Sequence, residues 1–118
     1  VCGPLIHEAA ADRIQDWIFD AEARGAQTLL RGEREGRVLS PVILKNVPLD
    51  HPLWAEEVFG PVVALREYTS LDEAVERVND SRFGLQAGIF TADLSVAQKT
   101  VDTLEMGGVL VNEIPTYR

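Results

Sequence analysis

The side chains best placed for chemistry lie in one short stretch that ends in a Gly-Pro pair. It holds two adjacent carboxylates, Glu56 and Glu57, and the aromatic ring of Phe59. Carboxylates accept hydrogen bonds from hydroxyl and amide donors, so the stretch has groups that can bind a polar ligand. Gly60 allows backbone angles that other residues avoid and Pro61 fixes its own, which holds the preceding residues in place. Taken locally, the same residues also describe a loop with two solvated glutamates and a core phenylalanine.

The other candidate residues give weaker signals. His51 could share a metal with Asp50 or Glu56, but the spacing matches no closed site, so we predict a loop histidine and no metal. Cys2 is the only cysteine, which excludes an internal disulfide and favours a reducing, cytoplasmic setting. We expect Cys2 to be a small, partly buried side chain and not a nucleophile.

Size and charge limit the classes of function. A chain of 118 residues is long enough to bury a core and predicts a single domain, residues 1–118. A net charge of −8 without a basic stripe argues against binding to nucleic acid or to an anionic membrane surface. Apolar stretches such as Pro41–Leu44 and Pro61–Leu65 are too short to cross a bilayer, and no signal peptide is recognisable.

The elements that position these residues begin with a helix predicted over His7–Arg24. Its apolar side chains recur at helical spacing and form one face: Ile6, Ala10, Ile14, Trp17, Ile18 and Ala21. The acidic line on the opposite face repeats at i+4: Glu8, Asp12, Asp16 and Asp20. This acidic line has two interpretations, a docking surface for a basic partner or a solvated face of a helix that its apolar side anchors.

Strands and helices then alternate along the chain. Apolar and β-branched runs predict strands at Val42–Leu44, Val62–Tyr68, Ala87–Phe90 and Val109–Asn112. From Val62 onward the order is strand, helix, strand, helix, strand, which predicts parallel strands joined by right-handed crossovers. The predicted fold class is therefore α/β, with a mostly parallel β-sheet flanked by helices.

Local signals mark the ends of these elements. Gly32 and Gly36 bracket a predicted turn, and a helical turn is expected at Pro52–Glu57. Ser70 and Glu73 have the spacing of a capping box at the start of the second helix. A third helix is expected to begin at a cap on Asp93 and to be closed by Gly107 and Gly108.

Several short stretches now line up in one order. They are Gly3-Pro4-Leu5-Ile6, Gly25-Ala26, Glu56-Glu57-Val58-Phe59-Gly60-Pro61-Val62, Asp72-Glu73-Ala74, Asn79-Asp80, Phe83-Gly84-Leu85-Gln86-Ala87-Gly88-Ile89-Phe90-Thr91, Leu104-Glu105-Met106-Gly107-Gly108-Val109 and Val111-Asn112. In this order and spacing the chain resembles the later part of the catalytic domain of the NAD(P)-dependent aldehyde dehydrogenase superfamily. The resemblance covers nearly the whole chain, and the series is far more specific than any one piece.

The resemblance implies an enzyme that oxidises an aldehyde to a carboxylic acid with NAD or NADP. A cysteine thiolate attacks the small-molecule aldehyde, hydride passes to the nicotinamide, and a glutamate-activated water hydrolyses the thioester. By its place in the family motif, Glu57 would accept hydrogen bonds from both hydroxyls of the nicotinamide ribose. Phe59 would pack near the nicotinamide, and Leu85 would line the nicotinamide and substrate region.

The resemblance also implies what the chain lacks. The family's cysteine nucleophile stands in a Gly-Gln-x-Cys context, which is absent here. We therefore predict cofactor-binding residues, no catalytic residue, and no aldehyde oxidation by this chain alone. Both ends look unlike exposed polar tails, so we expect a fragment of a longer chain. The resemblance further implies that the parent enzyme is a homo-oligomer, a dimer or tetramer.

The closing residues, Asn112 to Arg118, depart from the commonest family ending and resemble members that act on small polar aldehydes. Arg118 could then hold an anionic group, or it is a surface arginine. Two other hypotheses stay open here. One is a stand-alone α/β binding or regulatory module that uses the acidic line as its contact surface, and the other is a structural or assembly fragment without activity.

Overall fold

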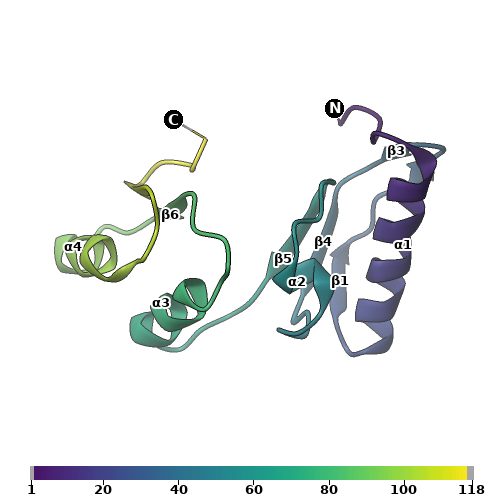
Figure 1. Ribbon diagram of the computed structural model, residues 1–118. Coiled ribbons are helices and arrows are strands. Elements are labelled where there is room, and N and C mark those ends of the chain that lie inside the picture. Colours follow the sequence, from purple (N-terminus) through teal and green to yellow (C-terminus); the bar gives the residue numbers. More distant parts are fainter. Residues whose placement is uncertain (1, 117–118) are drawn as a thin grey trace. The chain divides into compact units, whose positions relative to one another are not determined.

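The computed structural model describes residues 2–116, and the chain divides into two compact units (Figure 1). Unit 1 comprises Val1–Glu67 and unit 2 comprises Tyr68–Arg118. Each unit combines helices with strands, which confirms the predicted α/β class. Arg118, the candidate for an anion contact, lies outside the described residues.

Helix α1 of unit 1 runs from Glu8 to Ala23, close to its predicted bounds. The imidazole of His7 caps the first turn by accepting a hydrogen bond from the backbone N–H of Ala10 at 2.9 Å. The buried face of α1 consists of Ala10, Ala11, Ile14, Ile18 and Ala21. The predicted apolar face also includes Ile6, which is instead exposed because it precedes the first helical turn.

Helix α1 covers one face of a three-stranded sheet in unit 1 (Figure 1). The strands, in sheet order, are β1 (Gln27–Leu30), β4 (Val42–Lys45) and β5 (Val62–Leu65). The sheet is mixed, because β1 runs antiparallel to β4 whereas β4 and β5 are parallel. Side chains alternate between its faces, so Val42 and Leu44 are buried in the core while Val63 and Leu65 are exposed.

The connection between β1 and β4 folds into a hairpin of β2 (Arg34–Glu35) and β3 (Val38–Leu39). The turn predicted between Gly32 and Gly36 is therefore displaced. The chain reverses at Gly36 and Arg37, after β2 has formed. Gly36 has a φ of 56°, the left-handed conformation that a two-residue hairpin turn requires, so this second glycine sets the turn.

Unit 2 contains two helices and a pair of parallel strands within its described residues. The elements are α3 (Leu71–Asn79), β6 (Ala87–Ile89), α4 (Leu94–Thr103) and β7 (Val109–Val111). The parallel pairing of β6 with β7 confirms the prediction for two strands joined by a helix. The predicted cap also forms, because Ser70 Oγ accepts from the Glu73 N–H at 3.2 Å. In return, the Glu73 carboxylate accepts from the N–H of Thr69, the residue before the cap, at 3.3 Å.

Helix α4 begins at its predicted cap, Asp93, but ends earlier than predicted. Its last residue is Thr103, so the prediction that Gly107 closes the helix is wrong. The side chain of Asn79 fixes the break, because its amide donates to the Thr103 carbonyl at 2.8 Å. Its oxygen accepts from the backbone N–H of Glu105 at 2.9 Å, which draws the chain out of the helix.

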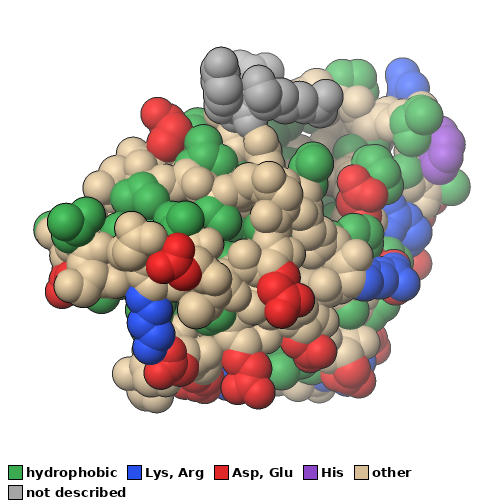
Figure 2. Space-filling view, turned by 60° about the vertical axis from the view of Figure 1, so that its left-hand side comes forward, with side chains coloured by type: hydrophobic (Ala, Val, Ile, Leu, Met, Phe, Trp, Pro, Cys, Tyr) green, Lys and Arg blue, Asp and Glu red, His purple; other side chains and the backbone are tan. Residues whose placement is uncertain are grey.

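Helix length and surface charge both limit the possible functions. None of the helices within residues 2–116 combines the length and the hydropathy of a membrane span. On the face shown in Figure 2, acidic side chains are more frequent than basic ones, as the net charge of −8 leads one to expect.

Candidate functional site

The approach to the Glu56–Gly60 stretch is a short helix, α2 (Pro52–Ala55), which confirms the predicted helical turn. His51 caps it, because its Nδ1 accepts a hydrogen bond from the Leu53 N–H at 3.0 Å. This bond places the imidazole proton on Nε2, which lies 3.2 Å from Asp20 Oδ2 on α1. His51 is fully buried, and its Nε2 makes no hydrogen bond within residues 2–116, so its contact with Asp20 is electrostatic.

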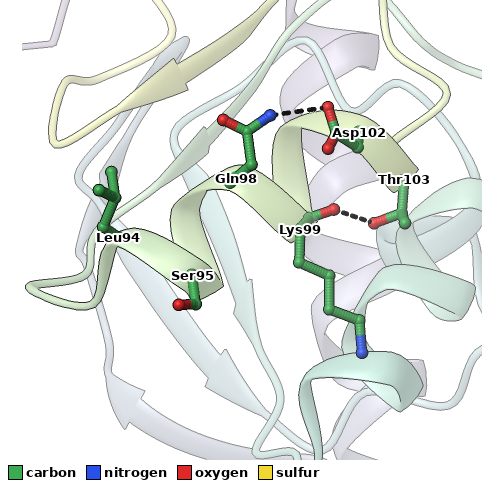
Figure 3. Close-up of a pocket in the computed structure, with 6 residues that line it drawn as sticks. All are labelled: Leu94, Ser95, Gln98, Lys99, Asp102 and Thr103. Carbon is green, nitrogen blue, oxygen red and sulfur yellow. Dashed lines mark hydrogen bonds between the residues drawn. The ribbon is translucent and has the colours of Figure 1, made fainter.

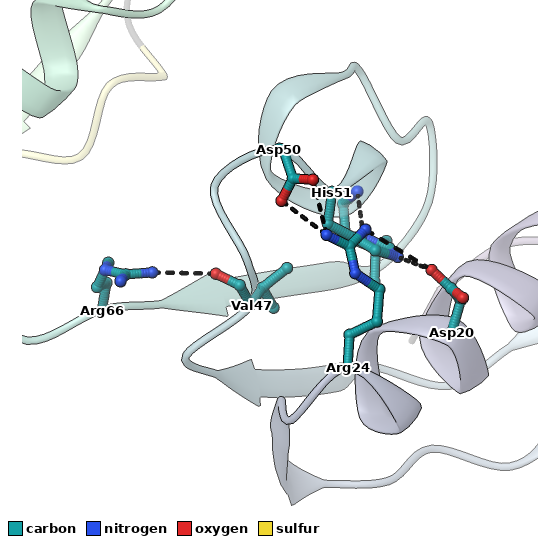
Figure 4. A network of polar contacts seen from close by, with 7 residues as sticks. Asp20, Arg24, Val47, Asp50, His51 and Arg66 are labelled. Carbon is teal, nitrogen blue, oxygen red and sulfur yellow. Dashed lines mark hydrogen bonds and ion pairs between the residues drawn. The ribbon is translucent and has the colours of Figure 1, made fainter.

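An ion pair beside His51 joins the end of α1 to the loop before α2 (Figure 4). The Arg24 guanidinium donates to both carboxylate oxygens of Asp50, at 2.8 and 2.7 Å. These hydrogen bonds lower the pKa of Asp50 below its ordinary value, and the pKa of Arg24 is raised by the same contact. The last turn of α1 is thus tied to the residues that open α2.

The loop after α2 carries Glu57 and Phe59, the two site residues predicted in this stretch. The side chains of Glu56, Glu57 and Phe59 are all exposed, and that of Phe59 is 72% exposed. Within the described part of the chain, the Glu57 carboxylate takes part in no hydrogen bond or ion pair. Phe59 is therefore not the core side chain that the local interpretation allows.

Phe59 also has a strained backbone, with a φ of 52° in the left-handed region. For a residue with a side chain this conformation costs about 1–2 kcal/mol. Such strain persists only where the surroundings impose it, and it is found preferentially at functional sites. The loop must therefore be held by contacts from outside.

Helix α1 supplies those contacts. Arg13 donates from its Nη2 to the carbonyl of Val58 at 2.9 Å, and the Val58 side chain packs against the core of unit 1. Gly60 lies so close to α1 that a Cβ atom there would stand 2.5 Å from Cδ1 of Ile14. The residues on either side of Phe59 are thus fixed to consecutive residues of α1. The sequence patterns did not indicate Arg13, which shows only as one basic residue on a helix.

Leu85, the third predicted site residue, lies in the loop between α3 and β6 of unit 2, with 75% of its side chain exposed. The Gly107 N–H donates to the Gly84 carbonyl at 2.8 Å. A Cβ on Gly107 would stand 2.9 Å from the Leu85 carbonyl oxygen, so this close approach requires glycine. Glu57 and Phe59 thus share one loop of unit 1, and Leu85 belongs to a separately built loop of unit 2.

The hollow drawn in Figure 3 offers no alternative site. All six of its lining residues come from α4: Leu94, Ser95, Gln98, Lys99, Asp102 and Thr103. Most of their polar groups already pair: Gln98 donates to Asp102 at 2.9 Å, Lys99 forms an ion pair with Asp72 at 2.5 Å, and the Thr103 hydroxyl donates to the Lys99 carbonyl at 2.6 Å. Within the described residues, no group of three or more His, Cys, Asp or Glu side chains could hold a metal ion.

Much of the acidic line on α1 is engaged inside unit 1. Asp12 pairs with Arg34 of β2 at 2.6 Å, and Asp20 lies beside His51 and 4.0 Å from Arg24. Two of its four carboxylates thus have partners inside unit 1, which argues against a dedicated docking surface.

The exposed loop can therefore bind a ligand that donates hydrogen bonds to a carboxylate and presents a flat apolar group to an aromatic ring. A diol next to a heteroaromatic ring fits the side chains of Glu57 and Phe59. No hydrogen bond or ion pair within residues 2–116 occupies the Glu57 carboxylate, so both of its oxygens are available. The only cysteine, Cys2, is half-buried ahead of α1.

The comparisons with known proteins agree on one family. Residues 1–118 match the sequence profile of the aldehyde dehydrogenase family. The 3-sulfolactaldehyde dehydrogenase of Priestia aryabhattai is 44% identical over 116 residues, which make up 98% of this chain and 24% of that protein.

Solved structures give the same result. Aldehyde dehydrogenase 21 from Physcomitrella patens, in complex with the reaction product succinate, matches with a TM-score of 0.92 at 42% identity. The NADP-dependent glyceraldehyde-3-phosphate dehydrogenase from Bacillus halodurans C-125, complexed with NADP, matches with a TM-score of 0.89 at 39% identity. In each case the match covers 98% of this chain and 24% of the other, so the chain spans about a quarter of the length of these relatives.

Proposed function

The chain belongs to the aldehyde dehydrogenase family, and from this premise we propose that it forms the cofactor-contacting part of a longer NAD(P)-dependent aldehyde dehydrogenase, called here the parent enzyme. The observation that carries the proposal is the loop of Glu57 and Phe59, which is exposed, strained and held by α1. The family assignment and this loop support each other, because the motif that carries the resemblance is the one that the fold holds in place.

In this proposal Glu57 accepts hydrogen bonds from the two hydroxyls of the nicotinamide ribose, and Phe59 packs beside the nicotinamide. A carboxylate with both oxygens available suits a vicinal diol, and an exposed ring suits a flat heterocycle. Leu85 lines the nicotinamide and substrate region from unit 2. The bound NAD or NADP supplies the hydride acceptor, and this chain's residues hold it in position.

The nucleophile and the general base would come from the other three quarters of the parent enzyme, because the chain spans only 24% of its relatives' length. We accordingly assign no catalytic residue to residues 1–118. We also propose a cytoplasmic homo-oligomer, and a single cysteine supports a reducing setting.

We propose a small polar aldehyde with an anionic group as the substrate. The names of the relatives support this class: one acts on a sulfonate, one holds succinate, and one acts on a phosphorylated aldehyde. Guanidinium groups recognise such anions in pairs of hydrogen bonds, and Arg118 is our candidate for this contact.

The stand-alone module is not favoured. The family match covers the whole chain, and part of its supposed contact surface is used inside unit 1. Membership of an enzyme family also argues for activity in the parent enzyme over a purely structural role.

The test is an assay of the purified parent enzyme with short anionic and neutral aldehydes of equal length, with NAD or NADP, following NAD(P)H absorbance. We expect kcat/KM for the anionic aldehydes to exceed that for the neutral ones by about tenfold or more, because each charge-assisted contact contributes that much. The 118-residue chain alone should form no NAD(P)H. A parent enzyme that oxidises no aldehyde with either cofactor contradicts the proposed function.

A further inference from the structure

The backbone around Val58 must be stabilised by contacts from outside the loop. The side chains of Glu57 and Phe59 are exposed to solvent, and Phe59 has a left-handed φ of 52° that an aromatic residue does not adopt by preference. Val58, between them, is the residue of this trio whose side chain packs against the core. The direction of both exposed side chains is therefore set by the peptide groups on either side of Val58.

Arg13 is bonded to one of these peptide groups. Its Nη2 donates to the Val58 carbonyl at 2.9 Å, across 45 residues of sequence. That carbonyl belongs to the peptide linking Val58 to Phe59, so the hydrogen bond acts on the unit whose rotation sets the φ of Phe59. A guanidinium donor makes a stronger bond to a carbonyl than a neutral donor does.

The guanidinium is itself held in place before it meets the loop. Its Cζ atom lies 4.3 Å from the centre of the Trp17 ring, one helical turn further along α1. Stacking on this ring restricts the rotamers of a long side chain, so less freedom is lost when the hydrogen bond forms. The next residue, Ile14, lies against Gly60 on the far side of Phe59.

We propose that Arg13 is a positioning residue for NAD(P), a role that rests on the proposed function of Glu57 and Phe59. Arg13 does not touch the cofactor. It fixes the Val58–Phe59 peptide so that the carboxylate and the ring meet the nicotinamide ribose and the nicotinamide together, and its loss releases the loop while the rest of unit 1 stays folded.

The test compares three variants of the parent enzyme. Arg13→Met keeps the apolar stem and its packing on Trp17 but removes the donor, and Arg13→Lys restores a cationic donor on a stem of similar length. Arg34→Met is the matched control, because Arg34 makes guanidinium contacts with Asp12 and Gln15 on α1 and none with the loop among the described contacts. Each variant is measured by NADH and NADPH fluorescence titration, by kcat and KM for both substrates, and by its thermal midpoint.

We expect Arg13→Met to weaken nucleotide binding about tenfold, the size of one charge-assisted hydrogen bond, while the KM for the aldehyde stays within about twofold. Arg13→Lys should recover most of the affinity. Arg34→Met should lower the thermal midpoint without changing nucleotide affinity, so a general loss of stability cannot produce the same pattern.

Wild-type nucleotide affinity in Arg13→Met, or equal weakening by Arg34→Met, overturns the proposal. Glu57→Gln, titrated in parallel, separates this inference from the function on which it rests. If Glu57→Gln weakens binding and Arg13→Met does not, only the positioning role fails, whereas an unaffected Glu57→Gln removes the cofactor role itself. If Arg13→Met does not fold, Arg13→Gln takes its place with the same outcomes.

Discussion

The contact between Gly60 and α1 makes a sharp prediction about the loop. In Gly60→Ala the new Cβ would stand 2.5 Å from Ile14 Cδ1, whereas carbon atoms in contact are separated by about 3.5–4.0 Å. Ile14 is fully buried, and close packing of the core resists rotation of its side chain. We therefore expect the loop to move outward by about 1 Å, and overpacking of this kind costs about 1–3 kcal/mol.

Ile14→Val, combined with Gly60→Ala, removes the Ile14 Cδ1 atom that the new Cβ would meet. The remaining neighbours of the new Cβ, Leu5 Cδ2 at 3.6 Å and Ile14 Cγ1 at 3.7 Å, are at ordinary contact distances. Ile14→Val alone leaves a small cavity and costs about 0.5–1.5 kcal/mol. The double variant should therefore be closer to wild type than the two single effects predict when added.

The assay is a double-mutant cycle in the parent enzyme, with NAD(P)H affinity and the thermal midpoint as its two readouts. We expect Gly60→Ala to weaken nucleotide binding about tenfold and the double variant to recover most of it, a coupling energy of about 1.4 kcal/mol. Simple additivity of the two changes, or a double variant worse than either single one, refutes the argument that α1 sets the position of the loop.

Two further predictions concern unit 2. The pKa of Glu73 lies below the ordinary value of 4.5, chiefly because its carboxylate accepts hydrogen bonds from Thr69. The ionised carboxylate therefore stabilises the fold above about pH 5, and this stabilisation is lost as the pH falls through the lowered pKa. Glu73→Gln should therefore make the thermal midpoint less dependent on pH from about pH 5 downward; an unchanged slope contradicts this. Gly107→Ala should destabilise the Leu85 loop by about 1–3 kcal/mol, because its Cβ meets a backbone oxygen at 2.9 Å. Gly108→Ala, with its nearest atom at 3.6 Å, should be tolerated, and equal thermal midpoints for the two alanine variants would refute the steric argument.

Elements with strong local signals could be predicted from the sequence. The apolar period of α1, the capping box of Ser70 and Glu73, and the cap at Asp93 each depend on residues a few positions apart. These signals are local because the backbone groups that they satisfy lie within one helical turn.

Features that depend on distant contacts could not be predicted. Helix α4 ends at Thr103 because the side chain of Asn79, on α3, hydrogen-bonds the backbone of Thr103 and Glu105. No residue type next to Thr103 predicts this end of the helix. The same holds for Arg13, whose bond to Val58 spans 45 residues. The motif indicates the loop of Glu57 and Phe59, but the contacts of Arg13 and Ile14 that hold it depend on the fold.

One titration shows whether Glu57 contacts the cofactor. NADH and NADPH binding is measured by fluorescence for the wild-type parent enzyme, for Glu57→Gln, and for the neighbouring Glu56→Gln as a control. Hydrogen bonds to a charged group contribute about 1.5–3 kcal/mol, so Glu57→Gln should bind at least tenfold more weakly, with Glu56→Gln within about twofold of wild type. Equal affinities for wild type and Glu57→Gln would contradict the assignment of this loop as the cofactor contact.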